Sequence, residues 1–236
     1  MSFLFFLLQS EHDVPANTRW LSERETVIAD QLKFPKRRQE WLLGRWTAKH
    51  ALHAFFQLVE KPEDALQELT AVETVTAEEF AIFEILPTGT GAPAAYLQGA
   101  IAPVSLSLSH RAGLAMCLIG LPGTAIGCDL ELIEPRSPEF IADYFTPAET
   151  SLIISLSEPN RSQTATLIWS AKESALKCLQ QGLNVDTRSV EVTLSDSESS
   201  PSKWQPFTIR ECTTNQRFSG WWRRQGTFLM TICGAI

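Results

Sequence analysis

Two carboxylates in one apolar segment are the first residues here that could do chemistry. In residues 125–133 (AIGCDLELI), Asp129 and Glu131 are two residues apart, so a strand would place both side chains on the same face. Carboxylates this close repel each other unless one is protonated or a cation neutralises both. Oxygen ligands without a nearby imidazole or thiolate favour Mg²⁺, with Mn²⁺ as a substitute. An edge strand with its polar face in water is the alternative, and this segment alone leaves both open.

A helix expected over residues 165–180 supplies the next candidates. In its sequence WSAKESALK, residues four apart stack, so Trp169, Glu173 and Lys177 share a face. Glu173 is a candidate third oxygen ligand beside a basic neighbour. A surface Glu–Lys pair, worth about 0.2–0.5 kcal/mol, is the alternative. Lys172 points away from this column, and a solvated side chain would explain it.

Glu149 allows two roles. In the sequence YFTPAE, Thr146 is expected as the N-cap of a helix, Pro147 as its first residue, and Glu149 as the third residue of a capping box. A carboxylate at a helix start could also orient or deprotonate a nucleophile. The two roles are compatible, and the sequence does not choose between them.

Hydroxyl, imidazole and basic groups in the first half could bind phosphate. Ser109 and His110 end an alternating strand, where both side chains could donate hydrogen bonds to a phosphate, although an exposed strand end is the commoner meaning. A basic run near the start of the first long helix could add a patch, although such a run usually marks a solvated helix start. Its residues are Lys36, Arg37, Arg38 and Arg45.

The elements that must position these residues follow from hydrophobic spacing and turn residues. We expect strands at residues 3–8, 104–109, 114–119 and 125–133, and helices from about residue 17 and over 36–58, 147–157 and 165–180. Further β-rich segments are expected at 190–194, 207–211 and 228–233, with a turn at 88–93, Gly182 after the last helix, and an exposed hairpin loop at 195–202.

One four-residue motif recurs in the chain. Trp46-Thr47-Ala48-Lys49 in the first long helix returns as residues 169–172 (WSAK), an offset of 123 positions (169 − 46). The recurrence suggests two related halves, and shared helix composition is the alternative. We expect an N-terminal lobe of residues 1–122 and a C-terminal lobe of residues 123–236. The C-terminal lobe carries the candidate metal ligands Asp129, Glu131 and Glu173.

Composition excludes several classes of protein. The chain has 236 residues, of which 44% are hydrophobic and 20% charged, as in a globular protein. A net charge of −7 gives no global attraction to nucleic acid or membrane, so neither is an expected partner. Five widely spaced cysteines without a CxxC pair indicate free thiols in a reducing compartment, and the apolar run 3–8 is too short for a signal or membrane span. We expect a cytoplasmic protein.

The ordered set of motifs resembles the two-domain 4′-phosphopantetheinyl transferases, of the surfactin-synthetase-activating type. The resemblance is carried by GCDLE, YFTPAE and WSAKESALK, with SLSH upstream and RRQEWLLGRWTAK in the first half. It implies an α+β fold of two pseudo-symmetric lobes, each a small antiparallel sheet packed on a long helix, with coenzyme A between them. It also implies a monomeric transferase that moves 4′-phosphopantetheine to a serine of an apo acyl, peptidyl or aryl carrier protein, releasing adenosine 3′,5′-bisphosphate.

The resemblance also assigns roles to residues. Asp129, Glu131 and Glu173 would hold magnesium against the pyrophosphate of coenzyme A, Glu149 would deprotonate the carrier serine, and Lys177 would neutralise the departing nucleotide. His110 would contact a coenzyme A phosphate, and Ser109 and Lys172 are further candidates for that contact. A phosphate-binding Gly-Lys-Pro turn of many relatives is Gly-Ala-Pro here, at residues 91–93, so that contact is expected to be missing or to come from Arg111. The early lysines of the relatives' N-terminal lobe have no clear counterpart, and the expected substitutes are Lys36, Arg37, Arg38 or Arg45.

Carrier proteins of fatty acid, polyketide and nonribosomal peptide synthesis are all compatible with the motifs. The alternative function is a non-catalytic module of the same fold that binds coenzyme A or a carrier protein. The four residues Asp129, Glu131, Glu173 and Lys177 argue against it, since binding alone would not require them all.

Overall fold

The chain forms two compact units, Met1–Thr124 and Ala125–Ile236, each described by itself. The computed structural model describes residues 3–58, 66–71, 75–180, 185–195 and 203–234. Gly182 and residues 196–202 of the expected hairpin loop lie outside this part of the chain. None of the described helices is both long and apolar enough to cross a membrane.

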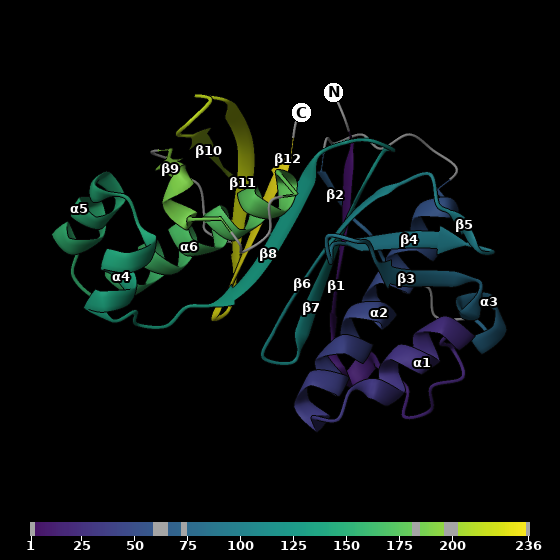
Figure 1. Ribbon diagram of the computed structural model, residues 1–236. Helices are drawn as coiled ribbons and strands as arrows, with labels where there is room; N and C mark the ends of the chain where they lie inside the picture. The colour runs from purple at the N-terminus through teal and green to yellow at the C-terminus, as the bar shows by residue number, and fades with distance from the viewer. Residues whose placement is uncertain (1–2, 59–65, 72–74, 181–184, 196–202, 235–236) are drawn as a thin grey trace. The chain divides into compact units, whose positions relative to one another are not determined.

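The first unit packs one long helix, α2, against a four-stranded sheet (Figure 1). The strand order is β2-β1-β7-β6, in which β1 and β2 are parallel and the other pairs are antiparallel; a second sheet has the order β3-β4-β5. The elements are β1 (Leu4–Ser10), η1 (Glu11–Asp13), α1 (Glu23–Gln31), α2 (Pro35–Phe56), β2 (Leu66–Glu68), α3 (Ala77–Ala81), β3 (Phe83–Pro87), β4 (Pro93–Leu97), β5 (Ala100–Ile101), β6 (Ser105–Arg111) and β7 (Leu114–Gly120).

The second unit packs its long helix, α6, against a five-stranded antiparallel sheet, β8-β12-β11-β10-β9 (Figure 1). Its elements are β8 (Ile126–Leu132), α4 (Pro138–Tyr144), α5 (Pro147–Ser155), α6 (Asn160–Cys178), η3 (Thr187–Ser189), β9 (Val190–Leu194), β10 (Gln205–Glu211), β11 (Arg217–Gln225) and β12 (Phe228–Gly234). Each unit is therefore a small sheet on a long helix, which confirms the expected α+β class.

The structure corrects several expectations. The helix expected from about residue 17 begins at Glu23, because Ser22 caps it. The sheet β3-β4-β5 and strand β11 were not predicted, and the parallel β1–β2 pair makes the first sheet mixed rather than antiparallel. Glycine is unfavourable in strands, so Gly220 argues against a strand at β11 when the sequence is taken alone. In the structure a Cβ at this position would clash with the ring of Phe207, so the glycine is needed there.

Helix α6 and strand β8 approach each other more closely than side chains ordinarily allow. A Cβ atom added at Gly127 would lie 1.9 Å from the carbonyl oxygen of Ser174 and 2.7 Å from the backbone nitrogen of Cys178. Both obstacles are backbone atoms of α6 or its last turn, so they cannot move aside as a flexible side chain would. The glycine therefore sets the distance between the strand that carries Asp129 and the helix that carries Glu173.

We expect Gly127→Ala to destabilise the protein by about 3 kcal/mol, because α6 must shift to admit the methyl group. The matched control is Gly44→Ala in α2, where a Cβ would meet nothing within 4 Å. That substitution removes a glycine from a helix interior and should stabilise by up to about 1 kcal/mol. Urea unfolding of both variants measures the difference, and equal stabilities would contradict the close approach.

Candidate active site

Strand β8 is an edge strand, but its polar face lies under α6 rather than in water. Asp129 is only 5% exposed, and its Oδ1 accepts a hydrogen bond from Nζ of Lys177 at 2.9 Å. The same ammonium donates to the carbonyl oxygen of Cys128 at 2.9 Å. Although burial lowers the pKa of Lys177, Asp129 and its neighbours raise it by more, so the net shift is upward. The solvated-edge interpretation of this strand is therefore wrong.

Glu131 lies on the same face of β8 and is held by two donors. Nε1 of Trp169 donates to Oε1 at 3.1 Å, and the Arg136 guanidinium donates to Oε2 at 3.3 Å. Arg136 also lies over the ring of Phe140, 5.1 Å from its centroid. Sequence reasoning missed Arg136, because its only signal is its place five residues after Glu131.

Glu173 completes the acidic group from the facing helix. Glu173 is only 7% exposed, and its Oε1 has no hydrogen-bond partner among the described residues. Burial first, and then the charges of Asp129 and Glu131, raise the pKa of Glu173 to about 7, while Lys177 opposes the shift. The alternative of a surface Glu–Lys pair is therefore wrong, because Glu173 is buried and Lys177 bonds to Asp129.

The three carboxylates suit a hard divalent cation in donor type and charge. Within the described residues, however, no three His, Cys, Asp or Glu side chains are already arranged to hold a metal ion. Lys177, Trp169 and Arg136 hold carboxylate oxygens of Asp129 and Glu131. A shared ion therefore requires these side chains to rotate and to exchange those bonds for metal bonds, whereas Glu173 presents a buried oxygen that already lacks a donor.

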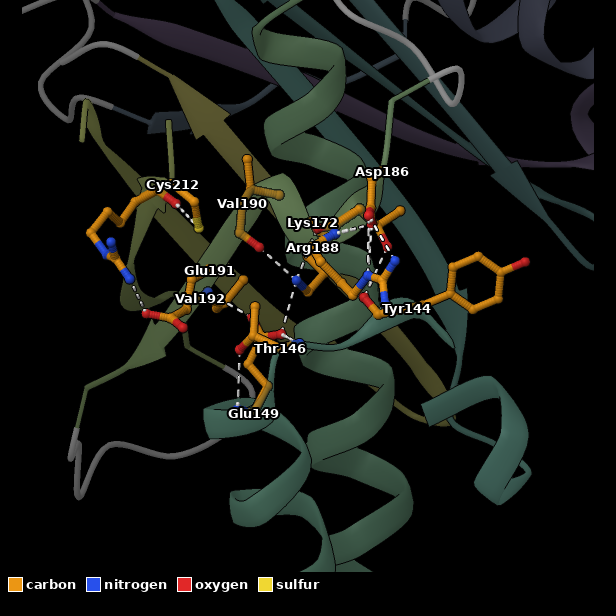
Figure 2. A network of polar contacts seen from close by, with 12 residues as sticks. Tyr144, Thr146, Glu149, Lys172, Asp186, Arg188, Val190, Glu191, Val192 and Cys212 are labelled. Atoms are coloured by element: carbon orange, nitrogen blue, oxygen red, sulfur yellow. Dashed lines mark hydrogen bonds and ion pairs between the residues drawn. The ribbon is translucent and has the colours of Figure 1, made fainter. Parts of the chain in front are cut away.

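Glu149 and Lys172 form a separate buried pair (Figure 2). Oε2 of Glu149 accepts from the backbone of Thr146 at 2.8 Å and from Nζ of Lys172 at 2.9 Å, while Oε1 accepts from the backbone of Val192 at 2.8 Å. The capping box expected at Thr146 is present.

Lys172 does not face a ligand. Its side chain is fully buried, and Nζ also donates to the carbonyl oxygens of Thr187 and Val190, at 3.0 and 2.6 Å. With Glu149, these acceptors use all three N–H groups of the ammonium. The expectation that Lys172 binds coenzyme A is corrected by this placement, since no N–H is left for a phosphate.

The other phosphate-binding candidates lie in the first unit. Ser109 is buried, His110 is exposed and Arg111 is half-buried at the end of β6. On α2, Arg38 is half-buried, while the Arg45 guanidinium lies over the ring of Trp41, 4.4 Å from its centroid. Burial lowers the pKa of Arg45 to about 10. The role of these residues toward phosphate stays a prediction.

Comparison with known proteins agrees with the motifs. Residues 125–233 match the family model of the 4′-phosphopantetheinyl transferase superfamily. The chain is 26% identical over 187 residues to the 4′-phosphopantetheinyl transferase HetI of a Nostoc species, covering 78% of this chain and 69% of that protein. It also resembles the crystal structure of Thermotoga maritima holo-(acyl-carrier-protein) synthase, with a TM-score of 0.34 and 18% identity over 62% of this chain and 76% of that chain.

Residues 125–233 therefore belong to the 4′-phosphopantetheinyl transferase superfamily. The matched region contains β8 and α6, and so it contains Asp129, Glu131, Glu173 and Lys177. The superfamily expected from the sequence is confirmed for these residues, while the two-domain type stays a prediction.

We expect Glu173→Gln to stabilise the metal-free protein at high pH. The pKa of Glu173 is about 7 when folded, against 4.5 as the ordinary value, so the folded state holds the proton more tightly and stability falls as pH rises through this window. The glutamine variant should gain about 3 kcal/mol over wild type between pH 4.5 and 8.

Chemical denaturation in the presence of a chelator measures that gain. Adding Mg²⁺ at pH 8 should then stabilise wild type more than Glu173→Gln, because only wild type carries the third carboxylate. Parallel stability curves for the two proteins across this pH range would refute a buried, charge-repelled Glu173.

Proposed function

We propose that the protein transfers the 4′-phosphopantetheine arm of coenzyme A to a serine of an apo carrier protein. The products are the holo carrier protein and adenosine 3′,5′-bisphosphate. The observation that carries this proposal is the buried carboxylate group on β8 and α6 with Lys177 beside it, inside the region matched to the superfamily. The HetI relative, which bears the transferase name, supports the same activity.

In the proposed reaction, the serine oxygen forms a bond to the phosphorus that bears pantetheine. The bond from that phosphorus to the oxygen bridging the two phosphates breaks, and the nucleotide leaves with the bridging oxygen. The serine proton is lost to a base. Catalysis of such a transfer depends on in-line positioning and on neutralising charge.

Asp129, Glu131 and Glu173 would hold the divalent ion, which when bound neutralises pyrophosphate oxygens. Lys177 is placed to balance charge at this group, because its ammonium already pairs with Asp129. If an ion takes that carboxylate, the lysine is released and its N–H groups can face the departing phosphate. Trp169 and Arg136 hold Glu131 in the same way until a metal competes for it.

Monomeric assembly and a cytoplasmic location are part of the proposal. The two compact units within one chain support a monomer. A reducing location is supported by the five cysteines, all of which are free thiols.

Incubation of apo acyl carrier protein with this protein, coenzyme A and Mg²⁺ should add one phosphopantetheine group, detected by intact mass spectrometry. A chelator should stop the transfer and excess Mg²⁺ should restore it. Asp129→Ala should slow transfer by about 100-fold or more, because it removes a ligand and leaves Lys177 without its carboxylate.

The matched control is Asp143→Ala in α4, which removes an exposed carboxylate outside the acidic group and should leave the rate unchanged. Absence of a mass shift with acyl, peptidyl and aryl carriers, despite binding of coenzyme A, would replace the transferase proposal with a binding module.

A further inference from the structure

Among the described residues, each unit contains a buried Glu–Lys pair. In the first unit, Nζ of Lys49 lies 2.6 Å from Oε2 of Glu25, and both side chains are fully buried. In the second unit, Nζ of Lys172 lies 2.9 Å from Oε2 of Glu149, with side-chain exposures of 0% and 2%.

Both glutamates hold the same local position. Each is the third residue of a short helix and completes a capping box, with Ser22 at the start of α1 and Thr146 at the start of α5. The other carboxylate oxygen accepts from a strand backbone: Ile85 of β3 donates to Glu25 at 2.9 Å, as Val192 of β9 donates to Glu149 at 2.8 Å. Each glutamate therefore ties a helix start, a strand and a lysine together.

Both lysines also hold the same local position. Each is the last residue of the recurring motif on a long helix. Nζ of Lys49 donates to the carbonyl oxygens of Trp20 and Phe80, at 2.8 and 3.1 Å, and Nζ of Lys172 donates to two carbonyl oxygens in the same manner. With its glutamate, each ammonium has three acceptors for its three N–H groups.

The residue after each lysine differs between the units. Glu173 follows Lys172, whereas His50 follows Lys49. The imidazole nitrogens of His50 have no hydrogen-bond partner among the described residues, and burial with the nearby His53 lowers its pKa to about 4, so it is neutral at pH 7. The first unit therefore has the buried Glu–Lys pair although no acidic residue follows its lysine on the helix.

From this recurrence we propose that Glu149 is a positioning residue and does not take the proton of the carrier serine. With Lys172 it fixes α6 to α5 and β9. Because adjacent residues on a helix are rotated by about 100°, this attachment turns Glu173 toward β8 and Asp129. The proposal refines the transferase function above and rests on it for its activity readout.

Glu149→Gln, Lys172→Met and the double variant test this role. Each single variant leaves one buried charge without its partner, which destabilises more than removing both charges. We expect each single variant to lower the melting temperature, weaken Mg²⁺ binding by about 10-fold and slow transfer to a similar degree. The double variant should recover at least about threefold in Mg²⁺ affinity and transfer rate over the weaker single variant, because no unpaired charge remains.

A general base gives the opposite pattern. Glu149→Gln would then slow transfer by at least about 100-fold with Mg²⁺ affinity unchanged, and the double variant would be equally slow. The melting temperature of Glu149→Gln falls under either role, because Lys172 loses its buried partner, so Mg²⁺ affinity and the double variant decide. That outcome overturns the proposal. If a single variant does not fold, the double variant still decides, because a protein without any carboxylate at position 149 must retain transfer if Glu149 only positions.

The first unit supplies the matched control. Glu25→Gln, Lys49→Met and their double variant should show the same loss and recovery in melting temperature, and Mg²⁺ affinity should stay unchanged throughout. If wild type transfers no phosphopantetheine, the transferase proposal fails, and the melting and Mg²⁺ titrations still report whether the Glu149–Lys172 pair positions Glu173.

Discussion

The acidic site depends on one steric constraint, the close approach of α6 to β8 at Gly127. Any side chain there would meet the backbone of α6, so the strand and helix can lie this close only with glycine. This approach puts Asp129 and Glu131 under the helix instead of in water. It also buries Glu173 beside them, and burial first, then the charges of Asp129 and Glu131, raise the pKa of that carboxyl group. Without it, the same residues would form an ordinary solvated edge strand and a surface ion pair.

Burial then decides what the carboxylates do. In water their mutual repulsion would be about 1 kcal/mol, whereas reduced solvent strengthens it severalfold. Lys177 compensates Asp129 directly, and Trp169 and Arg136 compensate Glu131. Glu173 is left with a buried oxygen that has no donor among the described residues. The negative charge of the three carboxylates is therefore not fully balanced by the basic side chains beside them, and a divalent ion would supply the missing positive charge.

Sequence periodicity predicted the elements that carry the site, and structure was needed for their contacts. A two-residue spacing placed Asp129 and Glu131 together, and a four-residue spacing placed Glu173 beside Lys177. Periodicity could not show that Lys177 reaches across to Asp129, nor that Lys172 is buried, because both depend on which elements pack against α6. Arg136 follows no spacing rule at all. Strand β11 was missed because Gly220 is unfavourable in strands by propensity. The ring of Phe207 in the neighbouring strand requires this glycine, and such a tertiary contact cannot be predicted from propensity.

The Glu–Lys pair occurs in both units, whereas the acidic residue that follows the lysine occurs only in the second. The recurrence therefore distinguishes residues with a structural role from residues proposed to act in the reaction. A buried ion pair adds little to stability when it is compared with apolar packing, but removing either partner leaves a buried charge and destabilises the protein strongly. In the first unit the residue after the paired lysine is the neutral His50. The buried Glu–Lys pair therefore does not require an acidic residue after its lysine. In the second unit, the acid at Glu173 costs stability at neutral pH and above. A loss of folding stability is expected at a functional site, where a side chain needed for the reaction can be unfavourable for folding. Here the surrounding contacts hold the buried carboxylate of Glu173 in place.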